Sequence, residues 1–338
     1  MHCGPYAALM TDAPRTALAL VVPQHGDSSV LTTRAWDVAP PGPGELTVRV
    51  AAAGVNFKDV YERQGIYPTH PPFVAGSEGA GTVEAVGDGV PFSLGDRVAW
   101  AQFSGSAAEL VTLPASVVVA VPDGLDLEVA AATMLQGLTA HYLVTSTYAV
   151  QPGDLVLAHA VAGGVGQLLV QLVKARGATL IGTASTAEKA AKATALGADH
   201  VIDYTQVEDL AGAVRELTGG AGVHVVYDGV GATTFDASLA SLRPRGTMVL
   251  YGAASGQVPP FDIQRLNVGG SLFLTRPTLA HYIATPEELA WRAGEVLGAL
   301  ADGSLRLEIG GRYPLGEASA AYDALEGRAT TGKLLLIP

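Results

Sequence analysis

The sequence predicts an α/β protein with two domains, one rich in short strands and one built on a doubly wound parallel sheet. Its 338 residues are more than a single ordinary core accommodates. The first third reads as short strands separated by glycine and proline turns. From about residue 126, helical and strand-like segments alternate with short loops, a pattern typical of a parallel sheet covered on both faces.

The β-rich part begins with apolar, β-prone runs at 16–22 and 45–55, separated by the PPGPGE turn at 40–45. Residues 77–90 alternate small and β-branched side chains between glycines, and the SLGD turn then leads into RVAWA. A last strand at 117–124 closes this region. Short strands punctuated by glycine favour a partly open barrel over a helical domain.

The alternating part opens with a helix over 126–144, where apolar residues recur at helical spacing and the first turn is acidic. The expected strands lie at 154–160, 178–184, 200–204, 224–231 and 247–254. The expected helices between them lie at 166–177, 186–197, 209–220 and 235–246. A long helix follows at 286–305, and the segment 311–338 ends in a strand that we expect to return to the first domain.

Charge and composition exclude several kinds of partner. The formal net charge of −12 repels phosphate backbones and anionic lipid, and no basic cluster offsets it, so neither nucleic acid nor a membrane is an expected partner. The apolar runs fall far short of the roughly 18 residues that a membrane-spanning helix needs. Cys3 is the only cysteine, which rules out an intramolecular disulfide and a thiolate zinc cage and favours a cytoplasmic protein.

The N-terminus lacks the basic start and apolar stretch of a signal peptide. Met10 offers a second start, so whether residues 1–9 belong to the native protein stays open.

The stretch HAVAGGVGQ at 159–167 is the first candidate for a binding site, because it joins an expected strand to an expected helix. A helix N-terminus presents unpaired N–H groups and a partial positive charge to a phosphate. In the G-x-G-x-x-G frame, Val161 takes the first glycine position and later glycines are kept. We therefore expect a dinucleotide pyrophosphate at Ala162, Gly163, Gly164, Val165 and Gly166, with a turn needed only for packing as the alternative.

The end of the next strand favours NADPH over NADH. NAD sites usually place a carboxylate about 20 residues beyond the loop, on the ribose 2′-hydroxyl. The sequence has no acid where that strand ends, at Thr183, and Glu188 is expected to project away from Lys189. Ser185 and Lys189 are the expected partners of a 2′-phosphate, although Lys189 also fits a solvated surface lysine.

Residues that follow the later strands gather at the carboxyl edge of the expected sheet, where ligands of doubly wound folds bind. Tyr204 is expected to flank the adenine. Gly229, Tyr251 and Gly252 are expected beside the cofactor, with Gly252 allowing close approach of its nicotinamide half. Each of these residues also fits a purely structural role in the turn that ends its strand.

Several stretches together resemble the medium-chain dehydrogenase/reductase superfamily, in its zinc-free, zeta-crystallin-like quinone oxidoreductase branch. They lie at 51–68, 71–90, 95–100, 159–166, 201–204, 225–231, 271–279 and 328–338, and the resemblance runs from about Thr16 to Pro338. It implies a GroES-like catalytic domain over 1–137 and 281–338 and a Rossmann NADPH-binding domain over 138–280. In this branch alanine commonly replaces the first loop glycine, and Val161 goes further.

The resemblance also predicts that no metal is bound. Where zinc alcohol dehydrogenases carry a cysteine and a G-H-E motif, this chain reads GVNFKD and GSEG. Asn56 stands near the place of the metal-binding cysteine, and Ser77 replaces the histidine before Glu78. The histidines show no H-x₃₋₅-H spacing, and we interpret His159 as a packing or capping residue.

The resemblance implies a cleft lined by Asn56, Tyr61 and Tyr67. The Asn56 amide is expected to donate to the acceptor oxygen or to fix the ribose, unless Asn56 is a turn residue. The tyrosine hydroxyls are suited to donating a proton or hydrogen bond, although both also fit half-buried aromatics. Further expected cofactor contacts are Thr139, Arg276, Arg328 and Lys333, the last three alternatively pinning the C-terminal strand. His141 and Tyr142 are weaker proton-donor candidates, since helix packing explains both more simply.

The expected activity is zinc-independent transfer of reducing equivalents from NADPH to a quinone, with the protein positioning the two π-systems. Two alternatives stay open: an enone or enoyl-thioester reductase of the same superfamily, and a weakly catalytic, crystallin-like protein that binds NADPH or RNA. The apolar, β-prone stretch within 255–276 predicts a homodimer seam.

Overall fold

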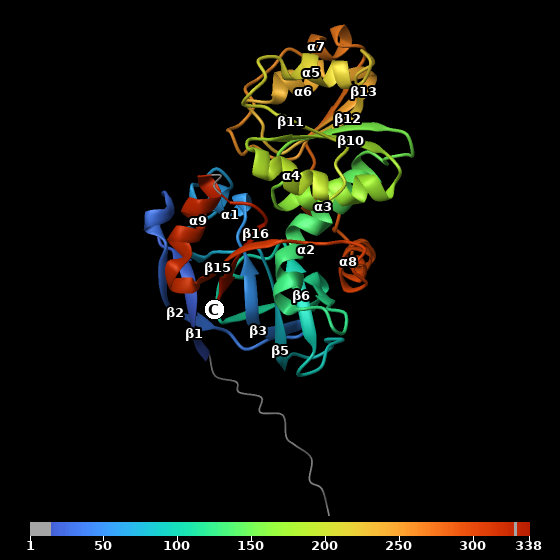
Figure 1. The fold of residues 1–338 in the computed structure, drawn as a ribbon. Coiled ribbons are helices and arrows are strands. Elements are labelled where there is room, and N and C mark those ends of the chain that lie inside the picture. The colour runs from blue at the N-terminus through green and yellow to red at the C-terminus, as the bar shows by residue number, and fades with distance from the viewer. Residues whose placement is uncertain (1–14, 328–329) are drawn as a thin grey trace, which may run out of the picture.

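The computed structural model describes residues 15–327 and 330–338, so Arg328 and the question of residues 1–9 lie outside it. Two lobes are joined through the long helix α2, as Figure 1 shows. One lobe is rich in strands, and the other holds a parallel sheet between helices. Within the described residues, no helix is long and apolar enough to cross a membrane.

The β-rich lobe contains a seven-stranded sheet of order β15-β16-β3-β5-β6-β8, with β7 pairing β3, and a small sheet of order β2-β1-β4. Its strands are β1 (Arg15–Val22), β2 (Thr32–Val38), β3 (Glu45–Gly54), β4 (Phe73–Val74), β5 (Glu78–Val86), β6 (Arg97–Ala101), β7 (Leu110–Pro114), β8 (Val118–Ala120), β15 (Ile309–Pro314) and β16 (Lys333–Ile337). Its helices are α1 (Phe57–Arg63) and α9 (Ala318–Glu326), with 3₁₀ turns at Ser28–Val30, Ala115–Val117 and Leu315–Glu317.

The C-terminal strand returns to this lobe, as the sequence predicts. β16 pairs antiparallel with β3, with Leu335 opposite Gly54, and its own side chains are buried. Segments from the two ends of the chain thus form one sheet, and they share one apolar core.

The second lobe is the expected doubly wound sheet, six parallel strands in the order β11-β10-β9-β12-β13-β14. The strands are β9 (Leu155–Ala158), β10 (Thr179–Ala184), β11 (His200–Asp203), β12 (Val223–Asp228), β13 (Leu242–Leu250) and β14 (Phe273–Thr275). The helices are α3 (Gly164–Ala175), α4 (Ala187–Ala195), α5 (Leu210–Leu217), α6 (Phe235–Ala240) and α7 (Gln264–Val268). Because the winding reverses between β9 and β12, a crevice forms where their carboxyl ends diverge.

One helix prediction is wrong at its end. The sequence predicts a helix to residue 246, but α6 stops at Ala240 and β13 begins at Leu242. Pro244 has no N–H for a helical hydrogen bond, and Arg245 adopts a left-handed φ of +61°. Both features are incompatible with a continuing helix.

Helix α2 (Leu127–Tyr142) connects the lobes and is capped by Asp126, whose carboxylate accepts the Glu128 N–H at 2.7 Å. It packs against β3, β5 and β6 on one side and against α3 and α8 (Pro286–Ala301) on the other. A π-helical turn at Leu143–Thr147 and a 3₁₀ turn at Leu279–His281 complete the junction. Because α2 runs unbroken through residue 137, the predicted domain limits at 137/138 and 280/281 stay predictions.

Val161 fits into the glycine loop because the residue that faces it on the next strand, Gly182, has no side chain. Val161 is fully buried, and a Cβ placed on Gly182 of β10 would lie 2.7 Å from its Cγ2. The left-handed turn residue is instead Ala160, with φ +53°. The valine at position 161 is therefore compatible with the fold because Gly182 on the neighbouring strand leaves space for its side chain.

This packing predicts that Gly182→Ala destabilises the protein by about 1–3 kcal/mol, since the added methyl overpacks a rigid core. In a Val161→Ala background the same substitution should cost less than about 1 kcal/mol, because the opposing branched side chain is gone. Urea unfolding of the four proteins measures the difference. Equal costs in both backgrounds would contradict this packing.

Candidate active site

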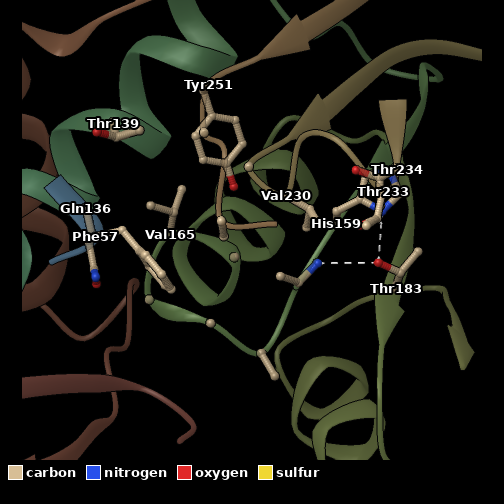
Figure 2. A pocket seen from close by; sticks show the side chains of 18 of the residues that line it. Phe57, Gln136, Thr139, His159, Val165, Thr183, Val230, Thr233, Thr234 and Tyr251 are labelled. Atoms are coloured by element: carbon tan, nitrogen blue, oxygen red, sulfur yellow. Dashed lines mark hydrogen bonds between the residues drawn. The ribbon is translucent and has the colours of Figure 1, made fainter. Parts of the chain in front are cut away.

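A cavity of about 1350 Å³ lies between the lobes. Its walls bring together most of the residues predicted from the sequence: Asn56, Tyr61, Tyr67, Thr139, Ala162, Gly163, Gly164, Val165, Gly166, Thr183, Ser185, Lys189, Tyr204, Gly229, Tyr251, Gly252 and Arg276. Figure 2 shows Thr139, Val165, Thr183 and Tyr251 around this space. Their shared location is established, and their individual roles stay predictions.

The glycine loop forms the phosphate-sized part of the cavity at the N-terminus of α3, where Gly163 is the N-cap. A Cβ on Gly166 would lie 2.3 Å from the Ala160 carbonyl oxygen, so only glycine fits this close approach. A Cβ on Gly164 would meet the Gln136 side chain at 2.0 Å. Close packing against Ala160 and Gln136 thus explains these two glycines, and the first-turn N–H groups of α3 lie at the cavity, where a helix N-terminus can bind a phosphate.

A buried polar network supports this loop from below. His159 is 1% exposed; its Nδ1 lies 3.1 Å from the Thr183 hydroxyl and its Nε2 lies 2.9 Å from the Ser238 hydroxyl. The Ser238 hydroxyl also donates to Asp228 at 2.8 Å. Burial lowers the pKa of His159, which keeps the ring neutral. Figure 2 shows the His159–Thr183 contact, and this geometry agrees with a packing role for His159.

The end of β10 presents the groups predicted for a 2′-phosphate. Ser185 and Lys189 line the cavity at the start of α4, whose N-cap Thr186 accepts the Lys189 N–H at 3.2 Å. Glu188 is exposed and pairs with Lys192 at 3.6 Å, away from the cavity. No carboxylate at the start of α4 thus opposes an anion beside Ser185.

The Asn56 side chain lines the cavity and is hydrogen-bonded within the protein. Its Nδ2 donates to Glu78 Oε1 at 2.7 Å and to the Gly54 carbonyl at 3.4 Å, and its Oδ1 accepts from Lys333 Nζ at 2.7 Å. Asn56 is 4% exposed, and both its Nδ2 and its Oδ1 are hydrogen-bonded to other groups of the protein. Asn56 therefore organises the floor of the cleft, and a contact of its amide with the acceptor oxygen or the ribose stays a prediction.

Lys333 is also placed differently from the predicted cofactor contact. Its ammonium is fully buried, bonds Glu78 and Asn56, and is not part of the cavity wall. This position agrees with the alternative that Lys333 pins the C-terminal strand. Within residues 15–327 and 330–338, no three histidine, cysteine, aspartate or glutamate side chains are grouped to hold a metal.

Tyr61 and Tyr67 form one wall of the cavity, with ring centroids 5.2 Å apart. Burial raises the pKa of Tyr61, and the Ala253 backbone across the cleft offsets part of this rise. A raised pKa keeps Tyr61 protonated at neutral pH, so its hydroxyl can donate. Tyr67 is more open, at 36% exposure.

The weaker proton-donor candidates on α2 are packing residues. His141 is buried and held between Glu295 at 2.8 Å and Arg292 at 3.2 Å. Tyr142 stacks on Tyr282 with ring centroids 4.2 Å apart, and burial raises its pKa.

The residues of the cavity wall that sequence reasoning missed include Phe57, Gln102 and Gln136. Gln136 lies in LQGLTAHY, where only later residues attracted attention. Gln102 follows β6 in a left-handed conformation, with φ +63°, which no sequence signal announces.

Comparisons with known proteins agree with this architecture. Residues 42–123 match the family model described as alcohol dehydrogenase GroES-like domain, and residues 164–288 match the one described as zinc-binding dehydrogenase. A quinone oxidoreductase of Pseudomonas aeruginosa is 47% identical over 317 residues, which cover 93% of this chain and 97% of that protein. A 2-haloacrylate reductase of a Burkholderia species is 42% identical over 95% of this chain and 99% of its own length.

Solved structures agree in the same way. The mycobacterial protein Rv1454c, solved with NADPH, has a TM-score of 0.92 and 52% identity over 95% of this chain and 100% of its own. The Escherichia coli quinone oxidoreductase, also solved with NADPH, has a TM-score of 0.91 and 42% identity, and the match covers 96% of this chain and all of that one, 100%. This chain belongs to the quinone oxidoreductase branch of the medium-chain dehydrogenase/reductase superfamily.

Proposed function

We propose that this protein reduces quinones with NADPH. One observation carries the proposal. A single cavity is lined by the glycine loop, by Ser185 and Lys189 as the proposed partners of the 2′-phosphate, and by the wall that Tyr61 and Tyr67 form. The relatives named quinone oxidoreductase support it over nearly the full chain. The single cysteine and acidic surface also support a cytoplasmic location.

The residues present fit NADPH. Gly163, Gly164 and Gly166 line the cavity at the N-terminus of α3, where the pyrophosphate would bind, and Ser185 and Lys189 supply a hydroxyl and a cation for the 2′-phosphate. When bound, NADPH supplies a hydride. The protein's part is to hold the acceptor against the nicotinamide position, exclude water and offer a hydrogen bond to the acceptor oxygen, for which the Tyr61 hydroxyl is one donor.

The floor of the cleft does not fit a divalent metal. Asn56 and Ser77 replace stronger ligands, and the Lys333 ammonium already neutralises Glu78. A second cation beside this ammonium would be repelled. The acceptor therefore has to be one whose own conjugation accepts the negative charge, as quinones and enones do.

A second candidate acceptor is an α,β-unsaturated carboxylate. Arg276 lines the cavity, bonds only the adjacent Pro277 carbonyl at 3.3 Å, and forms no ion pair with any carboxylate of the described residues. It follows β14, three strands from the glycine loop, which is roughly 14 Å away at ordinary strand spacing. The Burkholderia relative is named for an acceptor with such a carboxylate.

We expect the protein to oxidise NADPH in the presence of 1,4-benzoquinone or a 1,2-quinone, with NADH much less effective. The absorbance of NADPH at saturating quinone measures turnover, and 2-chloroacrylate and its methyl ester serve as the carboxylate and neutral alternatives. Tight NADPH binding without turnover of any of these acceptors would overturn the proposal.

The Lys189→Ala variant is expected to raise the KM for NADPH about 10-fold or more while leaving that for NADH unchanged, because a charge-assisted hydrogen bond to the 2′-phosphate is lost. Lys192→Ala is the matched control: it removes the same charge from α4, but Lys192 faces Glu308 and Thr331. Equal effects of the two variants would refute the assignment of Lys189.

We further propose a homodimer joined at the edge strand β14. Ile263, Val268 and Phe273 on and beside this edge are 68%, 85% and 61% exposed, and β14 has an unpaired side. Light scattering should give a mass near twice 34.5 kDa, and Phe273→Asp should shift it toward the monomer. A wild-type protein that stays monomeric at micromolar concentration would contradict this arrangement.

A further inference from the structure

Gln102 is held in a strained conformation at the cavity wall. It directly follows β6, and its φ of +63° is a left-handed value that costs free energy for any residue with a Cβ. Non-glycine residues with such geometry occur preferentially at functional sites, where the surrounding structure holds them.

The loop after Gln102 supplies that restraint. The fully buried Trp100 donates its indole N–H to the Ser106 hydroxyl at 2.8 Å, and that hydroxyl donates to the Phe103 carbonyl at 3.0 Å. The N–H groups of Gly105 and Ser106 both donate to the Gly76 carbonyl, at 3.0 and 3.2 Å. Tertiary contacts on both sides thus fix residues 102–106.

The position of Gln102 is on the acceptor side of the cleft. Ala101 pairs with Glu78 across β5 and β6, so Gln102 lies one residue beyond the Asn56–Glu78–Lys333 cluster. Phosphate-binding groups belong to the opposite lobe, at the ends of β9 and β10. A side chain of the β-rich lobe at this place lies on the side of the cavity where the acceptor would meet the nicotinamide.

Gln102 also has hydrogen-bonding capacity that Asn56 lacks. The Asn56 amide is satisfied by Glu78, Gly54 and Lys333. The Gln136 amide makes no hydrogen bond to the described residues, and its Oε1 is buried without a partner, but this side chain lies against Gly164 of the glycine loop. Gln102 lines the cavity with a half-buried side chain that makes no hydrogen bond to the described residues, and its carboxamide carries two N–H donors.

We propose that Gln102 is a catalytic residue that donates a side-chain N–H to the carbonyl oxygen of the acceptor. This inference rests on the proposed reductase activity. As hydride adds to the conjugated acceptor, the electron pair of the π-bond moves to that oxygen, and a proton from water completes a two-electron reduction. A side-chain N–H carried on this restrained backbone stabilises the oxyanion as its charge develops, and the rigid loop explains why strain at Gln102 is retained.

The test compares Gln102→Leu, Gln102→Ala and Gln102→Gly with the control Gln206→Leu, whose side chain is exposed and outside the cavity. We expect kcat with 1,4-benzoquinone to fall about 10- to 100-fold in the three Gln102 variants, as for loss of one oxyanion donor, with a smaller rise in KM. NADPH affinity, measured by fluorescence titration, should change less than about twofold, and the control should match the wild type.

Gln102→Gly separates this role from a structural one. Glycine adopts a φ of +63° without strain, so its thermal midpoint should equal or exceed that of the wild type while kcat falls. A structural role would instead lower activity only in variants that lose stability.

Binding of 1,4-benzoquinone to the NADP⁺-loaded protein, by calorimetry, tests the contact without turnover. We expect a Kd about two- to fivefold weaker for Gln102→Leu, as for a lost neutral hydrogen bond. If the wild type turns over no acceptor, the proposed function fails, and this binding difference still decides the contact. Gln102→Leu with kcat within about threefold of the wild type, or with an unchanged Kd, would overturn the proposal.

Discussion

The cleft depends on one buried carboxylate, that of Glu78. Its Oε1 accepts from the Asn56 amide and the Lys333 ammonium, and its Oε2 accepts the Leu135 N–H of α2 at 2.5 Å. Both Glu78 and Lys333 are fully buried, so each charge is tolerable only because the other is present. This contact joins β5, the N-cap of α1, the C-terminal strand and the helix between the lobes.

That arrangement also decides which groups of the cleft are free for chemistry. Asn56 is the residue that a reading of the sequence selects as a donor to substrate, yet its amide is used to hold Lys333. The donors that line the cavity include the protonated Tyr61 hydroxyl and the Gln102 amide, both from the β-rich lobe. The chain thus has a cleft between two lobes whose floor carries a buried ammonium beside Asn56 and Glu78, an arrangement that suits acceptors able to delocalise the negative charge themselves.

The sequence predicted most of what local pattern determines, and little of what distant contacts determine. Strand–helix alternation and the glycine loop follow from periodicity and from backbone sterics within about 30 residues, so the parallel sheet and the position of the loop at the N-terminus of α3 agree with expectation. The pairing of Lys333 with Glu78 spans 255 residues, and no periodicity announces it. The left-handed conformation of Gln102 and the space that Gly182 leaves for Val161 are likewise tertiary effects, invisible where a sequence shows only residue types.

The most direct test of this account is a double-mutant cycle on Glu78→Gln and Lys333→Met, with the free energy of unfolding measured in urea. Each single substitution strands one buried charge and is predicted to cost about 3–5 kcal/mol, whereas the double variant should cost less than either single one. Single costs below about 1 kcal/mol, or costs that simply add, would contradict the claim that this ion pair holds the cleft together.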